Sequence, residues 1–266
     1  MNNVEFPLFV AALGASEAGE SLKNTYRWAQ FRTTESNEDW IKYLGKTGQV
    51  FSHGILFFNY MKWFIAKENG RFTPEETETL LWGVAPHDTG EAKITGSVFV
   101  GDKSAQVKTA MDEKKETKVA YRVISLLGVP EEMRERLLEG YKKVVEGEDP
   151  KLHRAFKALE KSEYVFTAMK VYSNIKKFGN GEVLGLAAPM IGRVLVIDLA
   201  KVIDVYAPEY PNSIGRFFKE NHCVIDDMFA YSLPWLNANA EWMGKPVDHK
   251  GLASAFAQKW EAFKRS

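Results

Sequence analysis

His53 and the adjacent pair His87–Asp88 are the residues whose types and spacing best suit chemistry. An imidazole beside a carboxylate, at a helix end disturbed by Pro86 and Gly90, can direct two kinds of ligand atom at one ion. Neutral imidazole and carboxylate oxygen suit Mn, Co, Fe, Zn or Mg and do not choose among these metals. The competing interpretations are a capping interaction for the pair and a satisfied core residue for His53.

Two predicted helices must position these residues. Residues 49–67 carry His53 and Phe57 on one largely apolar side, with the spacing of a helix. A second helix is predicted to begin at Pro74, since Thr73 has the character of an N-cap and acidic residues follow in the first turn. The connection is short, so the two helices are expected to pack antiparallel and to bring His53 to His87–Asp88.

Helical signals continue along the chain and predict an all-α fold. Further helix starts are expected at Pro130 and Pro150, and alternating strand patterns are nearly absent. Residues 192–203 could form a strand by composition, but they fit a helix equally well. A turn signal at 178–181 divides the predicted core, residues 1–178, from a C-terminal helical extension, residues 179–266, packed on it. A small second domain is the alternative for the extension.

Composition narrows the function classes. Lys+Arg and Asp+Glu both number 35, so the formal net charge is zero, and no nucleic-acid duplex is expected as a partner. A single cysteine excludes a disulfide framework and a thiolate metal cluster. The longest apolar-rich segment, residues 55–66, is too short and too polar to span a bilayer, and no signal peptide is expected. These features predict a cytoplasmic protein with no membrane partner.

The remaining histidines carry weaker signals. His153 and His249 lie in polar contexts and are expected to be exposed. His222, Asp226 and Asp227 have helical spacing that is compatible with a second cation, although surface helices often carry such groups.

Three stretches of this chain are similar to the HD-domain phosphohydrolases, and most of all to the branch of 5'-deoxynucleotidases that hydrolyse nucleoside monophosphates. Arg27–Trp28 resembles the family's "RW…R" entry segment, with Arg32 following. Residues 87–91 and 94–96 resemble its "HDxxE…TG" run. Residues 158–164 resemble a helix with the pattern "DKxE", in which the last metal ligand, here Glu160, comes first. The resemblance covers roughly residues 23–172 and implies an HD-domain helical bundle.

The resemblance also implies roles for individual residues. One divalent metal ion would be bound by His53, His87, Asp88 and Glu160. Glu91 would orient or deprotonate the attacking water. Arg27 would contact the phosphate, and Trp28 would line the nucleoside pocket. Apart from the resemblance, Lys103 is a further residue that could reach a phosphate.

This chain departs from the family pattern at several of these positions. Glu160 stands where the family normally has Asp, which lengthens a ligand arm by one methylene. Ser97 stands where the family has the Asp of its "TGD" run, and Asp102 is the candidate substitute for that catalytic carboxylate. About fifteen extra residues separate Arg27–Trp28 from His53.

The sequence therefore predicts a metal-dependent phosphohydrolase that removes phosphate from a nucleotide, with a (deoxy)nucleoside 5'-monophosphate as the leading substrate and a homodimer left open. One alternative is a dNTP triphosphohydrolase or another phosphoesterase on the same metal core. The other is a non-catalytic nucleotide-binding protein on a degenerate HD scaffold.

Overall fold

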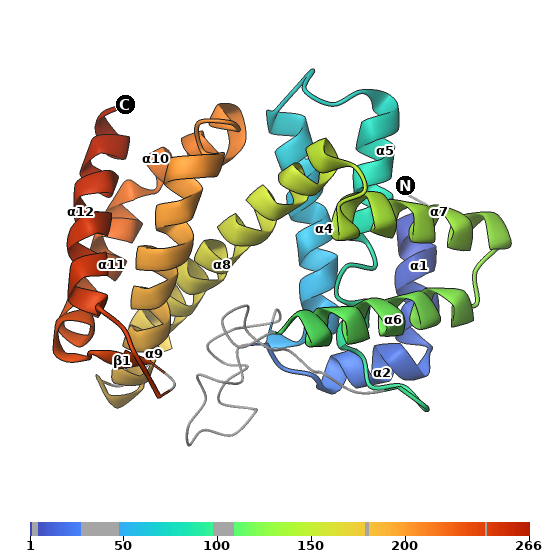
Figure 1. Cartoon of the computed structure of the whole chain (residues 1–266), viewed down its shortest axis with the longest axis horizontal. Helices are drawn as coiled ribbons and strands as arrows, with labels where there is room; N and C mark the ends of the chain where they lie inside the picture. The colour runs from blue at the N-terminus through green and yellow to red at the C-terminus, as the bar shows by residue number, and fades with distance from the viewer. Residues whose placement is uncertain (2–4, 28–47, 98–108, 179–180, 243) are drawn as a thin grey trace. The chain divides into compact units, whose positions relative to one another are not determined.

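The chain is all-α, as its sequence predicts (Figure 1). The structure is a computed structural model that describes residues 1, 5–27, 48–97, 109–178, 181–242 and 244–266. Within these ranges the extended structure amounts to the two-residue strands β1 (Glu241–Trp242) and β2 (Lys245–Pro246), which pair antiparallel. No helix in the described ranges combines the length and apolar character needed to cross a membrane.

The described residues form two compact units. The first unit runs to Lys157 and the second from Ala158 to Ser266. This division falls inside one long helix, α8 (Pro150–Phe178), whereas the turn signal in the sequence marks the end of that helix.

The first unit consists of helices and short helical turns. Its elements are α1 (Glu5–Gly14), α2 (Glu17–Asn24), α4 (Val50–Lys67), α5 (Pro74–Val84), the 3-10 turn η3 (Thr89–Glu91), α6 (Ala110–Leu126), α7 (Glu131–Tyr141), the π-helical turn η4 (Lys142–Glu146) and the first part of α8.

The second unit is also helical and contains several π-helical turns. Besides the rest of α8 and the β1–β2 pair, its elements are α9 (Gly181–Arg193), η5 (Val194–Leu199), η6 (Val202–Tyr206), η7 (Pro211–Gly215), α10 (Arg216–Glu220), α11 (His222–Ala238) and α12 (His249–Arg265). Residues 192–203, which are ambiguous in sequence, are therefore helical.

The predicted start of α5 is confirmed in atomic detail. The Thr73 side chain accepts a hydrogen bond from the Glu76 N–H at 3.2 Å, and the Glu76 carboxylate accepts one from the Thr73 N–H at 2.9 Å. Pro74 occupies the first helical position, where its missing N–H costs nothing. This capping box fixes the helix whose other end carries His87 and Asp88.

Close helix packing fixes α5 from a second side. Gly83 on α5 lies against Gly140 on α7, and a Cβ added to Gly83 would lie 2.4 Å from the Gly140 carbonyl oxygen. The two backbones can approach this closely because neither residue has a side chain. The last turn of α5 therefore has little freedom to shift.

Candidate metal centre

The turn after α5 and the first turns of α4 form the candidate metal centre. His53 is the fourth residue of α4. His87 and Asp88 follow α5 directly and precede η3, in a turn closed by hydrogen bonds from the Thr89 N–H and hydroxyl to the Pro86 carbonyl at 2.9 and 2.7 Å. The predicted packing of α4 on α5 is what brings His53 to this turn.

Ligand atoms from three residues converge at this place. Asp88 Oδ2 lies 3.0 Å from His87 Nε2 and 3.4 Å from His53 Nε2. One ligand atom from each of the three residues lies within 4.8 Å of the others, and no other such group of His, Cys, Asp or Glu occurs among the described residues. The three-residue core of the predicted metal site is therefore present in the first unit.

A backbone hydrogen bond sets the orientation of His87. Its Nδ1 lies 2.7 Å from the Val84 carbonyl oxygen. A carbonyl can only accept, so Nδ1 carries the hydrogen, and Nε2 of the neutral ring keeps its lone pair for a ligand. Histidines that bind metals commonly have this support from their other ring nitrogen.

Burial differs among the three residues. His53 is buried, with 4% of its surface exposed, whereas His87 and Asp88 are partly exposed. The Asp88 side chain keeps 23% exposure. An ion at this place would have protein on the side of His53 and a route to solvent beside Asp88.

The electrostatics of the centre favour an ionised Asp88. Burial alone would raise the pKa of this carboxyl, but the charges of protonated His87 and His53, together with that of Arg27, outweigh burial and hold the pKa below its ordinary value. A cation bound at this carboxylate would take the place of the imidazole protons, because the ligands of a metal must be deprotonated.

Arg27 lies within electrostatic reach of this centre. Residues 25–27 run beside the start of α4: the Arg27 N–H donates to the Gly48 carbonyl at 2.9 Å, and the Val50 N–H donates to the Thr25 carbonyl at 3.0 Å. Arg27 is buried, with 6% exposed, and its charge contributes to the lowered pKa of Asp88. The extra residues between Arg27 and His53 thus do not separate the two in space.

Glu91 is the last residue of η3, one turn after Asp88. Its N–H donates to the Asp88 carbonyl at 3.0 Å, and the residue is partly exposed. The "TG" run that follows forms a turn in which the Ser97 hydroxyl donates to the Ile94 carbonyl at 2.8 Å. Trp28, Asp102 and Lys103 lie outside the described residues.

Glu160 belongs to the second unit and is not part of the three-residue group. It lies on α8 close to Asp198 of η5. Burial raises the pKa of Asp198, and the charge of Glu160 adds to this rise, whereas Lys161, at 3.5 Å, opposes it. The role of Glu160 as a fourth ligand stays a prediction.

The sequence does not reveal two features that shape the centre. Gly90 allows α6 to approach, because a Cβ at this position would lie 2.5 Å from the Glu116 carbonyl oxygen. Phe57 and Phe156 form aromatic contacts with the imidazoles. The spacing of His53 and Phe57, four residues apart on a helix, is a signal for one of these contacts. Nothing in the sequence points to Phe156.

The expectation that His249 is exposed is wrong. Only 1% of its surface is exposed, and its Nε2 accepts a hydrogen bond from Arg193 Nη1 at 2.8 Å. Its polar sequence context reflects its position at the start of α12, next to the N-cap Asp248.

Within the part of the chain that the structure describes, His222, Asp226 and Asp227 do not assemble a second site. Asp226 accepts hydrogen bonds from Trp260 Nε1 at 2.7 Å and from Lys264 Nζ at 3.1 Å, and Asp227 pairs with Lys176. His222 is exposed and bonds the Lys219 carbonyl through Nδ1. These groups serve surface interactions in the second unit.

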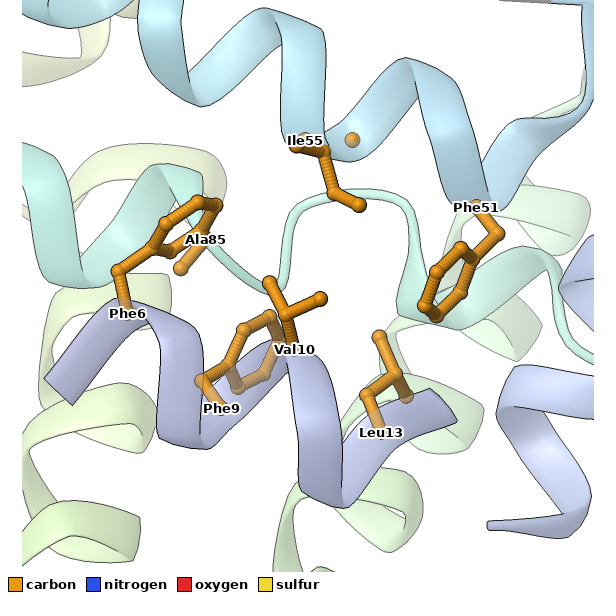
Figure 2. A pocket seen from close by; sticks show the side chains of 8 residues that line it. Phe6, Phe9, Val10, Leu13, Phe51, Ile55 and Ala85 are labelled. Carbon is orange, nitrogen blue, oxygen red and sulfur yellow. The ribbon is translucent and has the colours of Figure 1, made fainter. Parts of the chain in front are cut away.

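A small apolar cavity lies between α1 and α4, close to the centre in sequence but without polar side chains. Figure 2 shows it between residues of α1, residues of α4 and Ala85. Its volume is about 20 Å³, and its lining consists of Phe6, Phe9, Val10, Leu13, Phe51, Gly54, Ile55 and Ala85. A phosphorylated substrate would find no hydrogen-bond partner among these side chains.

The chain matches no protein-family model, no curated protein and no solved structure.

Proposed function

We propose that this chain binds one divalent metal ion at His53, His87 and Asp88 and uses it to hydrolyse a phosphate ester of a nucleotide. The observation that supports the proposal is the convergence of two imidazole Nε2 atoms on one carboxylate oxygen, at 3.0 and 3.4 Å. The nature of the substrate rests on the sequence resemblance to HD-domain phosphohydrolases.

The two separations from the Asp88 carboxylate to the imidazoles suit a shared ion. Two ligand atoms that each lie about 2.1 Å from one ion, at angles of about 90–110°, are about 3.0–3.4 Å apart. The separations from Asp88 Oδ2 to the two Nε2 atoms fall in this range. The mixed nitrogen and oxygen donors suit Mn, Fe, Co, Zn or Mg and do not choose among these metals.

The chemistry that surrounds the centre suits hydrolysis of a phosphoester. A divalent ion supplies charge neutralisation for the phosphate and lowers the pKa of a bound water. Glu91, one turn after Asp88, provides a carboxylate that can accept a proton. Arg27 provides a guanidinium suited to bidentate contact with a phosphate.

Glu160 is a candidate ligand by the sequence resemblance alone, and its role is tested separately from the three-residue group. Glu160→Gln keeps the size of the side chain and removes its charge. We expect this variant to bind Mn²⁺ about tenfold or more weakly than wild type, a loss typical of damage to a metal site. Unchanged affinity would remove Glu160 from the set and leave the three-residue group as the whole protein contribution.

The deciding experiment measures hydrolysis by the purified full chain. Deoxynucleoside monophosphates and triphosphates are incubated with Mn²⁺ or Co²⁺, and orthophosphate, pyrophosphate and triphosphate are quantified separately. Asp88→Asn should lose activity, whereas Asp227→Asn, the same change at an exposed acid of α11, should retain it.

The products distinguish the alternatives. Orthophosphate from a monophosphate supports the proposal, and inorganic triphosphate from a dNTP indicates a triphosphohydrolase on the same metal core. A protein that binds nucleotide without turnover and contains no metal by elemental analysis would be a binding protein, and the proposed activity would be wrong.

A further inference from the structure

Phe57 contacts both imidazoles of the metal centre. Its ring centroid lies 4.5 Å from that of His87, with an interplanar angle of 35°, and 5.8 Å from that of His53, with an angle of 49°. The two imidazole centroids are 5.7 Å apart. Phe57 itself is 1% exposed, so its ring has no room to leave this position.

A second aromatic ring supports this arrangement. Phe156, on the part of α8 that belongs to the first unit, lies 6.0 Å from His87 and packs edge-to-face on Phe57 at 5.9 Å. It is 2% exposed. The His87 ring is therefore bounded by two buried aromatic side chains, and their close packing limits the rotamers available to all three rings.

The hydrogen bond to the Val84 carbonyl does not by itself fix the His87 ring. It restrains Nδ1, at 2.7 Å, but an imidazole held at one atom can still pivot about that bond and move Nε2. The face of Phe57 at 4.5 Å blocks this pivot on one side. Ligands of a metal site must be held to within about 0.5 Å by packing and hydrogen bonds from surrounding residues.

We propose that Phe57 is a positioning residue that sets the direction of both Nε2 atoms toward the ion, an inference that rests on the proposed metal site. Phe57 does not ligate, because it has no donor atom. It acts through His53 and His87, so its loss should weaken metal binding even though all ligands remain.

The neighbouring residue provides a matched control. Phe58 has the same side chain, lies on the same helix and is equally buried, with 2% exposed. Its ring stacks on Phe6 of α1, with centroids 3.5 Å apart and an interplanar angle of 6°. It therefore packs on α1, and none of its described ring contacts is with an imidazole.

The test compares Phe57→Leu and Phe58→Leu in the full chain. Co²⁺ is titrated into each protein, and affinity and the visible absorption spectrum of the bound ion are recorded, with thermal unfolding as a measure of stability. We expect Phe57→Leu to bind Co²⁺ about tenfold more weakly and with an altered spectrum, as when a supporting residue is lost. Phe58→Leu should lose stability but keep the affinity and spectrum of wild type.

The outcomes separate the positioning role of Phe57 from the existence of the metal site. Equal Co²⁺ affinity and spectra in the two variants would overturn the role of Phe57 while leaving the metal site intact. A wild-type protein that binds no Co²⁺ would instead overturn the proposed metal site. If Phe57→Leu does not fold, the pair Phe57→Met and Phe58→Met gives the same comparison with less change in volume.

Discussion

His87 in the first unit and His249 in the second unit share the same hydrogen bond at Nδ1 but have different partners at Nε2. In both, Nδ1 bonds a backbone carbonyl, of Val84 at 2.7 Å and of Asn239 at 2.8 Å. Both rings therefore present Nε2 as an acceptor. The two histidines differ in what that acceptor meets.

The Nε2 atom of His249 is paired with a positively charged side chain, that of Arg193. Arg193 Nη1 donates to its Nε2 at 2.8 Å, and the guanidinium stacks over the Trp242 ring at 4.2 Å. Burial lowers the pKa of Arg193 to about 10, with Asp198 opposing the change. At His87, by contrast, Nε2 faces the carboxylate of Asp88, with His53 beside it. A buried acceptor nitrogen thus indicates a metal site only where further anionic or neutral ligands converge on the same point.

We expect the largest effect, the loss of metal binding, in His87→Ala. Loss of supporting residues around a metal weakens binding about 10–100-fold, so loss of a ligand should exceed that range. His249→Ala should leave metal affinity unchanged, because its Nε2 is already bonded to Arg193. Isothermal titration of Mn²⁺ into both variants measures the difference, and equal losses would contradict a site confined to the three-residue group.

His249→Ala should instead destabilise the fold. Removing the acceptor leaves a buried guanidinium N–H without this bond, which costs about 2 kcal/mol of unfolding free energy. The change is measured by urea unfolding, with the fluorescence of the nearby Trp242 and Trp235 as a probe.

The control for this prediction is His222→Ala in the same unit. His222 is exposed, and surface substitutions of this kind usually change stability by less than about 0.5 kcal/mol. A similar loss in both variants would show that the Arg193–His249 bond contributes little.

The same two histidines show how far the sequence could predict the molecule. His87 and Asp88 are adjacent, and their turn follows a helix whose start at Thr73–Pro74 is readable, so the three-residue group could be predicted from local patterns and one helix pairing. The partner of His249 is 56 residues away and has no local signal. Its burial could not be predicted, because it depends on the packing of α9, β1 and α12.

The helical class could be predicted because local signals specify helices. The division into two units could not be predicted in this way. N-caps, prolines and apolar spacing specify most helices locally, whereas residues 192–203 fit a strand equally well in sequence and are helical in the structure. The place where the compact units divide, after Lys157 and within α8, depends on contacts between distant segments. The contact of Phe156 with His87 in the candidate metal centre has the same origin, because α8 brings it there across 69 residues.

Gly90→Ala tests whether metal binding at the candidate metal centre depends on the position of the turn that carries Asp88. The new Cβ would lie 2.5 Å from the Glu116 carbonyl oxygen and 2.9 Å from its carbon, and a backbone neighbour cannot move aside cheaply. We expect a loss of about 1–3 kcal/mol, as for other overpacked sites, together with weaker Mn²⁺ binding because the turn must shift. Normal affinity with reduced stability would show that the ligands tolerate movement of this turn.

Gly54→Ala is the smallest and most local of these changes, and it should increase the stability of the protein, whereas Gly90→Ala should decrease it. Gly54 follows His53 within α4 and lines the apolar cavity of Figure 2. A Cβ there meets no atom within 4 Å. Alanine is favoured over glycine inside a helix by about 0.5–1 kcal/mol, so the variant should unfold at a higher temperature. Because the backbone of α4 does not have to move, Mn²⁺ affinity should stay at the wild-type value despite the neighbouring ligand. Reduced affinity would mean that the position of His53 depends on the freedom of the backbone at residue 54. The candidate metal centre would then be less rigid than the Arg193–His249 pair.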